Sequence, residues 1–330
     1  MPAFLTHCFF AEDVLKKIKN INLKQKISKR KTLYFLGSQG PDIFFYYRAK
    51  PWTKDDGLSK LGLTIHDSKV QDFFIESLKY IKTNESCQDL FDDLSVYMAG
   101  YICHYRLDKT AHPLIHYLAG IYKNTAETKK YHTYHRKLES IIDLLMLKNK
   151  NYKSPYKFRG YKLIEKYTKY TGSLLDYYKF ILNKVYKTDI KESQLLTAIS
   201  DMYDILKLLR DPYGLKWLAY KIIEILLGEN GQITSSMLPR SFNKKADYLN
   251  LKNNKWNHPC FKDKIFNSSF IELYKMGAKE AAISVELMQS FLEKNKGLLE
   301  IKSHFKNESY STGIKCGSKE LKYFNCIFEK

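Results

Sequence analysis

Apolar residues recur three and four positions apart along most of the chain, which is the spacing of residues on one face of an α-helix. This pattern predicts helices over residues 10–20, 67–82, 131–148, 174–187, 191–210, 214–227 and 269–295. Another helix is predicted to begin at a capping box of Ser86 and Asp89, and its apolar stripe runs through Leu90, Leu94, Tyr97, Met98, Tyr101 and Tyr105. Residues 24–31 are basic and poorly patterned, residues 37–42 are typical of a turn, and residues 308–328 are expected to form a loop or a short hairpin.

Composition favours the same architecture. Eight prolines and fifteen glycines in 330 residues are few for a chain of short strands and tight turns, and Gly228 and Gly231 mark the end of one predicted helix. The sequence has no internal repeat and no low-complexity linker. We therefore expect an all-α protein with one compact domain over residues 1–330, in which residues 1–145 carry the candidate chemistry and residues 146–330 add helices and an irregular tail.

The charge adds a hint about partners. The chain has 55 Lys and Arg against 35 Asp and Glu, so its formal net charge is +20. This charge favours a polyanionic partner such as nucleic acid, an anionic membrane surface or a phosphate-bearing substrate. Lysines dispersed over solvated faces would give the same total. The 44% hydrophobic content excludes a disordered polyelectrolyte.

The six cysteines do not form a recognisable framework. None of them lies in a C-x-x-C pair, which argues against a thiolate zinc finger and against a secreted disulfide scaffold. The N-terminal residues lack the pattern of a signal peptide, and no apolar run approaches the roughly 18 residues of a membrane span. We expect a cytoplasmic protein that at most touches a membrane from the inside.

Candidate chemistry begins with the histidines, because five of the nine fall within 32 residues. His104 and Asp108 are four residues apart, so they lie on one face of a helix, and Tyr97 and Tyr101 place that face on the apolar stripe. A carboxylate turned into a core costs several kcal/mol unless it is paired or bound to a metal. Taken alone, the pair is equally consistent with a structural histidine that donates to the aspartate.

The arrangement recurs at His135 and Glu139, on the apolar stripe of the helix predicted over 131–148. Two His-x-x-x-acid insertions into apolar faces favour binding of a divalent metal by imidazole and carboxylate groups, as in zinc sites without thiolates. His112 precedes Pro113, which disfavours helical backbone, so we expect His112 at a helix end.

Three neighbouring residues leave alternatives open. His116 competes with His112 as a ligand on spacing grounds, although its aromatic neighbours favour a packing role. His132 is expected to face solvent, and Asp143, four residues after Glu139, is a candidate to orient a ligand.

Further candidates lie upstream: His7 in an apolar stretch, Asp42 at the end of the turn Gly40-Pro41-Asp42, and His66 before a helix start. In this order the motifs resemble the zinc-dependent phospholipase C family of bacteria, an all-α family whose fold is shared with the single-strand-specific zinc nucleases of fungi and plants. The resemblance is close over residues 1–145 and extends loosely through residues 256–259 and the helix predicted over 269–295.

The resemblance implies two or three zinc ions. One would be bound by Asp42, His66, His104 and Asp108, a second by His112, His135 and Glu139, and a third by His7, a bridging Asp108 and the N-terminal residue. Asp42 would also act as the general base. The chain departs from the family pattern at the N-terminus, where no leader and no Trp is found, and at Ile43, where an aromatic choline-binding residue would be expected.

The function implied is zinc-dependent hydrolysis of a phosphodiester, with a phospholipid headgroup as the substrate. The alternatives are a zinc nuclease of the same fold, which the charge of +20 would suit, and a non-catalytic protein that a metal cluster stabilises. Motifs for other chemistry, namely G-x-S-x-G, a P-loop and G-x-G-x-x-G, do not occur in the sequence.

Overall fold

The structure is a computed structural model of the 330-residue chain, and it describes residues 4–50, 53, 57–167, 170–228, 231–294 and 297–329. The α-helices of these residues are α1 (Phe4–Lys17), α2 (Ile21–Lys29), α3 (Lys31–Gly37), α4 (Leu58–Asp67), α5 (Val70–Thr83), α6 (Gln88–Ala119), α7 (Lys129–Asn149), α8 (Thr171–Ile181), α9 (Glu192–Leu209), α10 (Leu215–Leu226), α11 (Phe270–Lys294) and α12 (Leu298–His304). Short helical turns join them, among them η1 (Gly40–Tyr46), η4 (Leu182–Tyr186) and η5 (Thr234–Ser236). The all-α prediction is confirmed.

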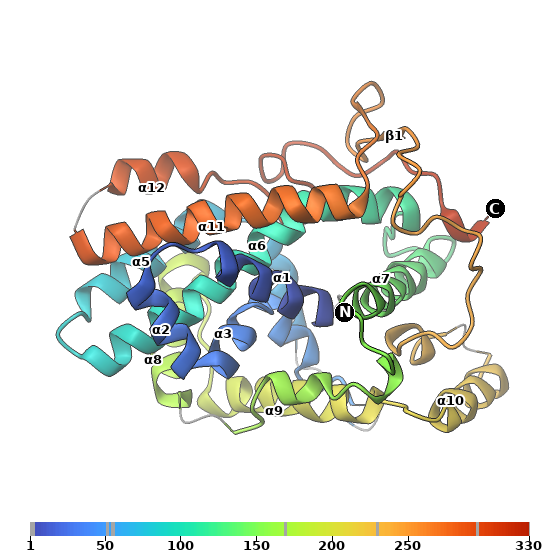
Figure 1. Ribbon diagram of the computed structural model, residues 1–330, viewed down its shortest axis with the longest axis horizontal. Helices are drawn as coiled ribbons and strands as arrows, with labels where there is room; N and C mark the ends of the chain where they lie inside the picture. Colours follow the sequence, from blue (N-terminus) through green and yellow to red (C-terminus); the bar gives the residue numbers. More distant parts are fainter. Residues whose placement is uncertain are drawn as a thin grey trace.

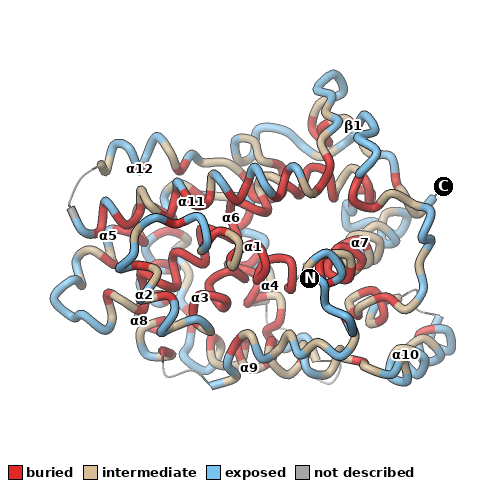
Figure 2. The backbone as a smooth tube through the Cα atoms, viewed as in Figure 1, coloured by how far each residue is buried: buried red, intermediate tan, exposed pale blue. Residues whose placement is uncertain are grey.

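Helix α6 forms the centre of the molecule. Most of its residues between Phe91 and Ala119 are buried, and α1, α3, α7 and α11 pack around it. Figure 1 shows α11 running alongside α6, with α9 at the lower edge and α10 at the lower right corner. Figure 2 shows the buried residues concentrated in the middle of the molecule, whereas α10 and α12 are exposed along much of their length. None of the described helices is long and apolar enough to span a membrane.

Several predicted helices match the structure to within two residues at each end, namely those over 131–148, 191–210, 214–227 and 269–295, which correspond to α7, α9, α10 and α11. The tail contains an isolated bridge between Glu308 and Lys315 and a short turn at Ile327–Glu329, as expected for a loop-like segment. The one sheet among the described residues is a hairpin of two short strands, β1 (Trp256–Asn257) and β2 (Ile265–Phe266), which the sequence pattern did not predict.

The N-terminal quarter differs from the prediction. The first helix begins at Phe4, not at residue 10, and residues 24–31 belong to α2 and α3 except for Arg30, which joins the two helices. Leu23 and Ile27 lie one turn apart and are fully buried, while Asn20 caps α2 through the backbone N–H of Leu23 at 2.8 Å. Two well-placed apolar residues and a cap thus suffice for a short helix despite the dense basic charge.

Other boundaries also shift. The helix predicted over 67–82 is divided, since α4 ends at Asp67 and α5 begins at Val70. The predicted capping box of Ser86 and Asp89 is wrong, because Cys87 occupies the N-cap of α6 and no side chain of the described residues caps that end. The helix predicted over 174–187 corresponds to α8 and the wider turn η4, and Lys187, directly after η4, has a φ of 56°.

Pro113 does not end a helix. Helix α6 continues through it to Ala119, so the prediction that His112 stands at a helix end is wrong. A proline in a helix interior removes one hydrogen bond and costs about 3 kcal/mol. The burial of α6 against its neighbours on several sides offsets that cost, because each large apolar side chain removed from water contributes about 1.5–3 kcal/mol.

Two glycines let α3 approach α6 at backbone distance. A Cβ atom on Gly100 would lie 2.2 Å from the carbonyl oxygen of Tyr34, and one on Gly37 would lie 2.2 Å from the carbonyl oxygen of Tyr97. Only the absence of a side chain allows this contact. The close approach matters for the chemistry because α3 leads directly into η1, which carries Asp42.

We predict that Gly100→Ala destabilises the protein by about 1–3 kcal/mol, because the new methyl group collides with backbone that cannot move aside. Gly172→Ala in α8 is the matched control, since a Cβ there meets nothing within 4 Å and the substitution gains up to about 1 kcal/mol from helix propensity. Denaturant unfolding of both variants measures the difference, and equal effects of the two substitutions would contradict this account of the contact.

Candidate metal centre

Helix α6 supplies three of the candidate side chains. His104, Asp108 and His112 are spaced by four residues, so they occupy successive turns of one face, and all three are buried. Because α6 is covered by neighbouring helices, this polar face lies in the interior of the protein. The burial of two imidazoles and a carboxylate therefore requires partners from other elements.

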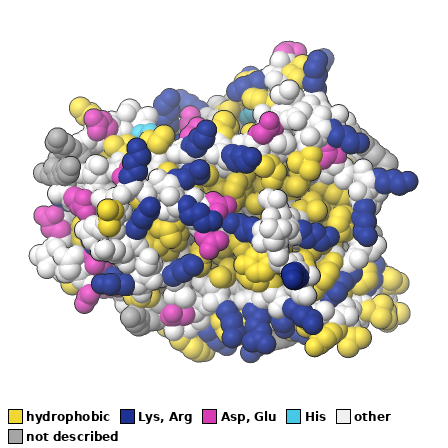
Figure 3. All heavy atoms as spheres, viewed as in Figure 1, with side chains coloured by type: hydrophobic (Ala, Val, Ile, Leu, Met, Phe, Trp, Pro, Cys, Tyr) yellow, Lys and Arg dark blue, Asp and Glu magenta, His cyan; other side chains and the backbone are white. Residues whose placement is uncertain are grey.

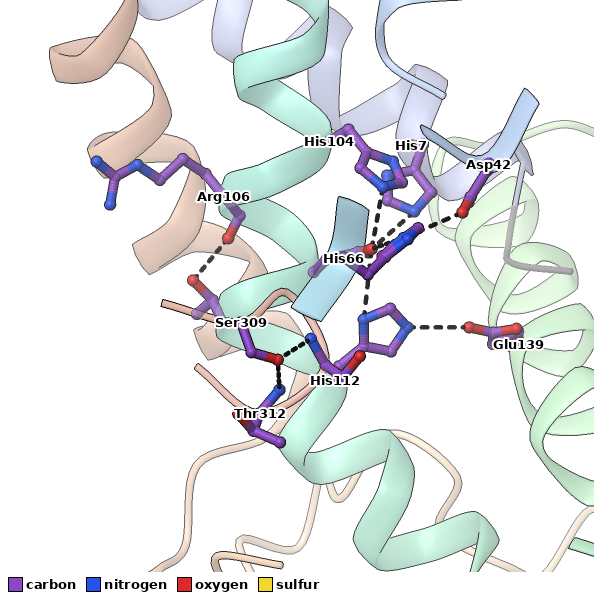
Figure 4. A network of polar contacts seen from close by, with 12 residues as sticks. His7, Asp42, His66, His104, Arg106, His112, Glu139, Ser309 and Thr312 are labelled. Carbon is purple, nitrogen blue, oxygen red and sulfur yellow. Dashed lines mark hydrogen bonds and ion pairs between the residues drawn. The ribbon is translucent and has the colours of Figure 1, made fainter. Parts of the chain in front are cut away.

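The carboxylate of Asp108 is the common partner. Its Oδ1 lies 3.2 Å from His7 Nε2, and its Oδ2 lies 3.1 Å from His104 Nε2, 3.4 Å from His112 Nδ1 and 3.7 Å from His66 Nε2. Figure 4 shows these four imidazoles turned toward one space, with Asp42 and Glu139 at its edge. Burial alone would raise the pKa of Asp108, but His104, His112 and His7 lower that pKa well below its usual range.

Asp42 reaches the site because of an unusual turn. Gly40 has a φ of 51°, and a Cβ atom on it would lie 2.3 Å from Cδ2 of His104, so the turn before Asp42 passes directly against that ring. Asp42 is buried, and neither of its carboxylate oxygens makes a hydrogen bond with the described residues. Its Oδ1 lies 3.2 Å from His66 Nε2.

His66 occupies the last turn of α4 in a fixed orientation. Its Nδ1 is 2.6 Å from the carbonyl oxygen of Gly62, so Nδ1–H donates to that carbonyl and Nε2 faces the carboxylates of Asp42 and Asp108. Burial would lower the pKa of His66, but the two carboxylates raise it to about 10. In the neutral ring Nε2 carries a lone pair, so its position between two carboxylates calls for a proton or a metal cation.

Helix α7 supplies the second half of the centre. His135 Nε2 and His112 Nε2 lie 3.2 and 3.3 Å from the same oxygen, Glu139 Oε1. Burial would raise the pKa of Glu139, but the imidazoles of His135 and His112 hold it well below the usual range. Glu139 lies on the buried face of α7 with Leu138 and Ile142, so its carboxylate points into the protein.

The structure distinguishes the two competing histidines. His112 contacts the carboxylates of both Asp108 and Glu139. The ring of His116 instead packs against two other imidazoles, with its centroid 5.0 Å from that of His135 and 5.8 Å from that of His112. Burial and these neighbouring imidazoles lower the pKa of His116 well below its usual value. His132 is exposed and lies beside Tyr122, as expected.

Asp143 is bonded to α1. Its carboxylate accepts hydrogen bonds from Leu5 N at 3.1 Å, from Thr6 N at 2.7 Å and from Thr6 Oγ1 at 2.6 Å. These contacts satisfy free N–H groups in the first turn of α1. Asp143 thus positions α1, which carries His7, against α7. These hydrogen bonds go to α1 and not to a candidate metal ligand.

Three groups of side chains have donor atoms within 4.8 Å of one another and could each hold a metal ion: His7, Asp42 and His104; His66, His104 and Asp108; and His112, His135 and Glu139. The donor set fits zinc, since it combines imidazole nitrogens with carboxylate oxygens. Several of these atoms, including both ring nitrogens of His104 and Oε2 of Glu139, are buried without a hydrogen bond to the described residues. Such orphaned buried atoms are expected where a cation binds.

One residue of the surroundings escaped the sequence analysis. The Tyr310 ring lies 5.1 Å from the ring of His66 and 5.8 Å from that of His104, and its backbone N–H donates to the carbonyl oxygen of His66 at 2.9 Å. Tyr310 is fully buried, although it belongs to an irregular tail. No periodic pattern marks such a position, because the chain reaches it through a loop.

A small cavity lies beside η1 and α7, although none of the candidate metal ligands lines it. It has a volume of about 100 Å³, and its lining includes Tyr46 at the end of η1, Ser140 next to Glu139, Asp143 and Arg210. Phe158, Leu206 and Met237 make part of the wall apolar. The cavity therefore borders the elements that carry Asp42 and Glu139.

We predict that Tyr310→Ala weakens zinc binding by about 10–100-fold, because the ring that supports His66 and His104 is lost. Tyr310→Phe keeps the ring and is the matched control, with affinity close to that of the unaltered protein. Competition with a chromophoric chelator measures both affinities, and circular dichroism verifies that both variants are folded. Unchanged zinc affinity in the folded Ala variant would contradict this role.

The comparisons with known proteins identify the family. The family model described as zinc dependent phospholipase C matches residues 6–200. Comparisons with curated proteins and with solved structures gave no match. The matched segment covers more than half of the chain and contains all the histidines and carboxylates of the centre, whereas Tyr310 lies outside it. The chain belongs to the zinc-dependent phospholipase C family.

Proposed function

We propose that this protein is a zinc-dependent hydrolase that releases the phosphorylated headgroup of a phospholipid. The observation that carries the proposal is the convergence of buried imidazoles and carboxylates from α1, η1, α4, α6 and α7 on one space, with three groups able to hold a metal ion. Family membership supports the same class of substrate.

We further propose how the ions would be shared. His112, His135 and Glu139 would hold one ion, in the grouping expected from the sequence. His66, His104 and Asp108 would hold another, with Asp42 at its edge.

His7 lies close enough to Asp42 and His104 to hold a third ion with them, and it also contacts Asp108 at 3.2 Å. Two or three zinc ions per chain would fill these groups.

Bound zinc ions would neutralise the phosphodiester oxygens and lower the pKa of an attacking water. Asp42 would accept the proton of that water, because its carboxylate is buried and both of its oxygens are free of hydrogen bonds from the described residues. The contact of Asp42 with His66 keeps its carboxylate directed into the centre. The cavity bordered by η1 and α7 would hold part of the substrate.

The headgroup differs in our proposal from phosphatidylcholine. Ile43 stands where the family resemblance suggests an aromatic residue for choline, and its side chain is buried and aliphatic. An aliphatic side chain offers no cation–π contact to a quaternary ammonium group.

We also propose a cytoplasmic location at the face of a membrane. All six cysteines are unpaired, and four of them are buried. Free thiols in this number suit a reducing compartment.

We predict that Asp42→Asn lowers turnover of phospholipid by about 10²–10⁴-fold, because the amide cannot accept the proton. The zinc content should stay near that of the unaltered protein, since the amide oxygen can still contact a cation. Asp176→Asn, the same substitution at an exposed position of α8, is the control and should leave turnover unchanged. Headgroup phosphate release and elemental analysis give the two measurements.

The substrates in this assay also separate the alternatives. Zinc-loaded protein that hydrolyses single-stranded nucleic acid and no phospholipid would support the nuclease, which the charge of +20 favours. Zinc-loaded protein that hydrolyses neither would refute both enzymes and support a metal-stabilised structural role. Full turnover by Asp42→Asn would refute the role of Asp42.

A further inference from the structure

Helix α10 has its apolar face on the outside of the protein. Leu215, Leu218, Ile222, Ile225 and Leu226 are between 50% and 79% exposed. Their spacing of three and four residues places them on one continuous face. An exposed apolar face of this size on a soluble protein is typical of an interaction site.

Polar contacts hold the opposite face of α10 against the protein. Glu224 is buried and accepts hydrogen bonds from Ile233 N at 2.6 Å, from Thr234 N at 2.8 Å and from Thr234 Oγ1 at 2.6 Å. At the start of the helix, Asp211 accepts from Gly214 N and Trp217 N, both at 2.9 Å. These contacts fix the orientation, so the outward position of the apolar face is built into the fold.

The charges around this face suit an anionic surface. Lys216 and Lys221 lie on its two borders, on either side of the apolar arc. The two acidic residues between positions 211 and 226, Asp211 and Glu224, are buried and accept hydrogen bonds from backbone N–H groups. Figure 3 shows apolar side chains at the lower right, where Figure 1 places α10, with Lys and Arg side chains close by.

The same charges disfavour a second copy of this chain as the occupant. Two α10 faces brought together would set lysine borders near lysine borders, and among the described residues of α10 no exposed acidic side chain compensates them. A bilayer with anionic lipids accepts the apolar side chains among its acyl chains and attracts the lysines to its headgroups. With 12 residues α10 is too short to cross the bilayer, so it would lie in the interface.

The position of α10 connects it to the metal centre. Glu224 bonds α10 to η5 through Thr234, and the carbonyl oxygen of Ser235 in η5 accepts a hydrogen bond from Ser140 Oγ at 2.7 Å. Ser140 follows Glu139 in α7. A short chain of hydrogen bonds thus links α10 to α7, the helix that carries His135 and Glu139. A lipid surface bound to α10 would therefore lie on the side of the protein that α7 adjoins.

We propose that α10 is an interfacial helix that docks the protein on an anionic lipid surface through its outward apolar face and its bordering lysines. An effect of this docking on phospholipid turnover rests on the proposed phospholipase function. Binding of the protein to the lipid surface does not depend on that function. The proposal assigns to residues outside the matched part of the family the task of bringing the metal centre to its substrate.

Flotation with phosphatidylglycerol vesicles tests the docking. The unaltered protein should float with them, and Leu218→Ser/Leu226→Ser should bind at least about tenfold more weakly, since each leucine contributes more than a kcal/mol when it leaves water. The matched control is Ile283→Ser/Leu299→Ser, which removes two side chains of similar exposure, 60% and 81%, on α11 and α12. The control should bind like the unaltered protein.

A second variant keeps the test independent of any loss of folding. Lys216→Gln/Lys221→Gln leaves the apolar face intact, so it should weaken binding to phosphatidylglycerol vesicles and leave any binding to phosphatidylcholine vesicles unchanged. Failure of the unaltered protein to float, or equal flotation of the protein and its Leu218→Ser/Leu226→Ser variant, would overturn the proposal. The proposal would also be overturned if the unaltered protein formed a dimer in solution and bound no lipid, and if the leucine variant were monomeric. That result would identify a second copy of the chain as the occupant of this face.

Turnover measured separately distinguishes this inference from the proposed function. With a short-chain phospholipid kept monomeric, the two leucine substitutions should leave kcat and KM unchanged, whereas turnover on vesicles should fall together with binding. Vesicle binding without turnover of any phospholipid would refute the phospholipase and leave the docking surface supported.

Discussion

The carboxylate of Asp108 lies buried among four imidazoles, and the arrangement of the N-terminal half follows from that contact. Taking one carboxylate out of water costs several kcal/mol unless partners compensate it. Its two oxygens lie within 3.1–3.7 Å of nitrogens on α1, α4 and two further turns of α6. Each of these elements must therefore pass close to the same point. The positions of α1 and α4 relative to α6 thus bring the nitrogens of His7 and His66 to this carboxylate.

Close backbone contact makes this convergence possible. Gly37 and Gly100 bring α3 against α6, and Gly40 then turns the chain past the ring of His104 so that Asp42 enters the centre. At the other end, Asp143 binds the first turn of α1 and fixes His7 relative to α7. Three glycines and the carboxylate of Asp143 thus determine the geometry of the site, although none of them supplies a donor atom to it.

Much of this was predictable from the sequence, because helical spacing carries the information. The pairs His104 with Asp108 and His135 with Glu139 share a face whenever the helix forms, and the helices are strongly patterned.

Local rules failed where tertiary packing decides. Pro113 predicts a helix end, yet α6 is buried enough to continue through it. Tyr310 reaches His66 through an irregular loop, which leaves no periodic signal. For α10 the pattern predicted the bounds to within one residue, but only the structure shows that its apolar face points outward, since periodicity does not say which side is covered. The division of the chain into a metal-binding part and a helical remainder stays a prediction.

The count of zinc ions per chain tests the central claim most directly. Elemental analysis of the purified, zinc-replete protein, together with the variant His104→Ala/Glu139→Ala, measures it without reference to any substrate. The account predicts two or three zinc ions in the unaltered protein and their loss from the variant, because each proposed ion depends on His104 or on Glu139. A protein without zinc, or a folded variant that keeps its full zinc content, would contradict the account.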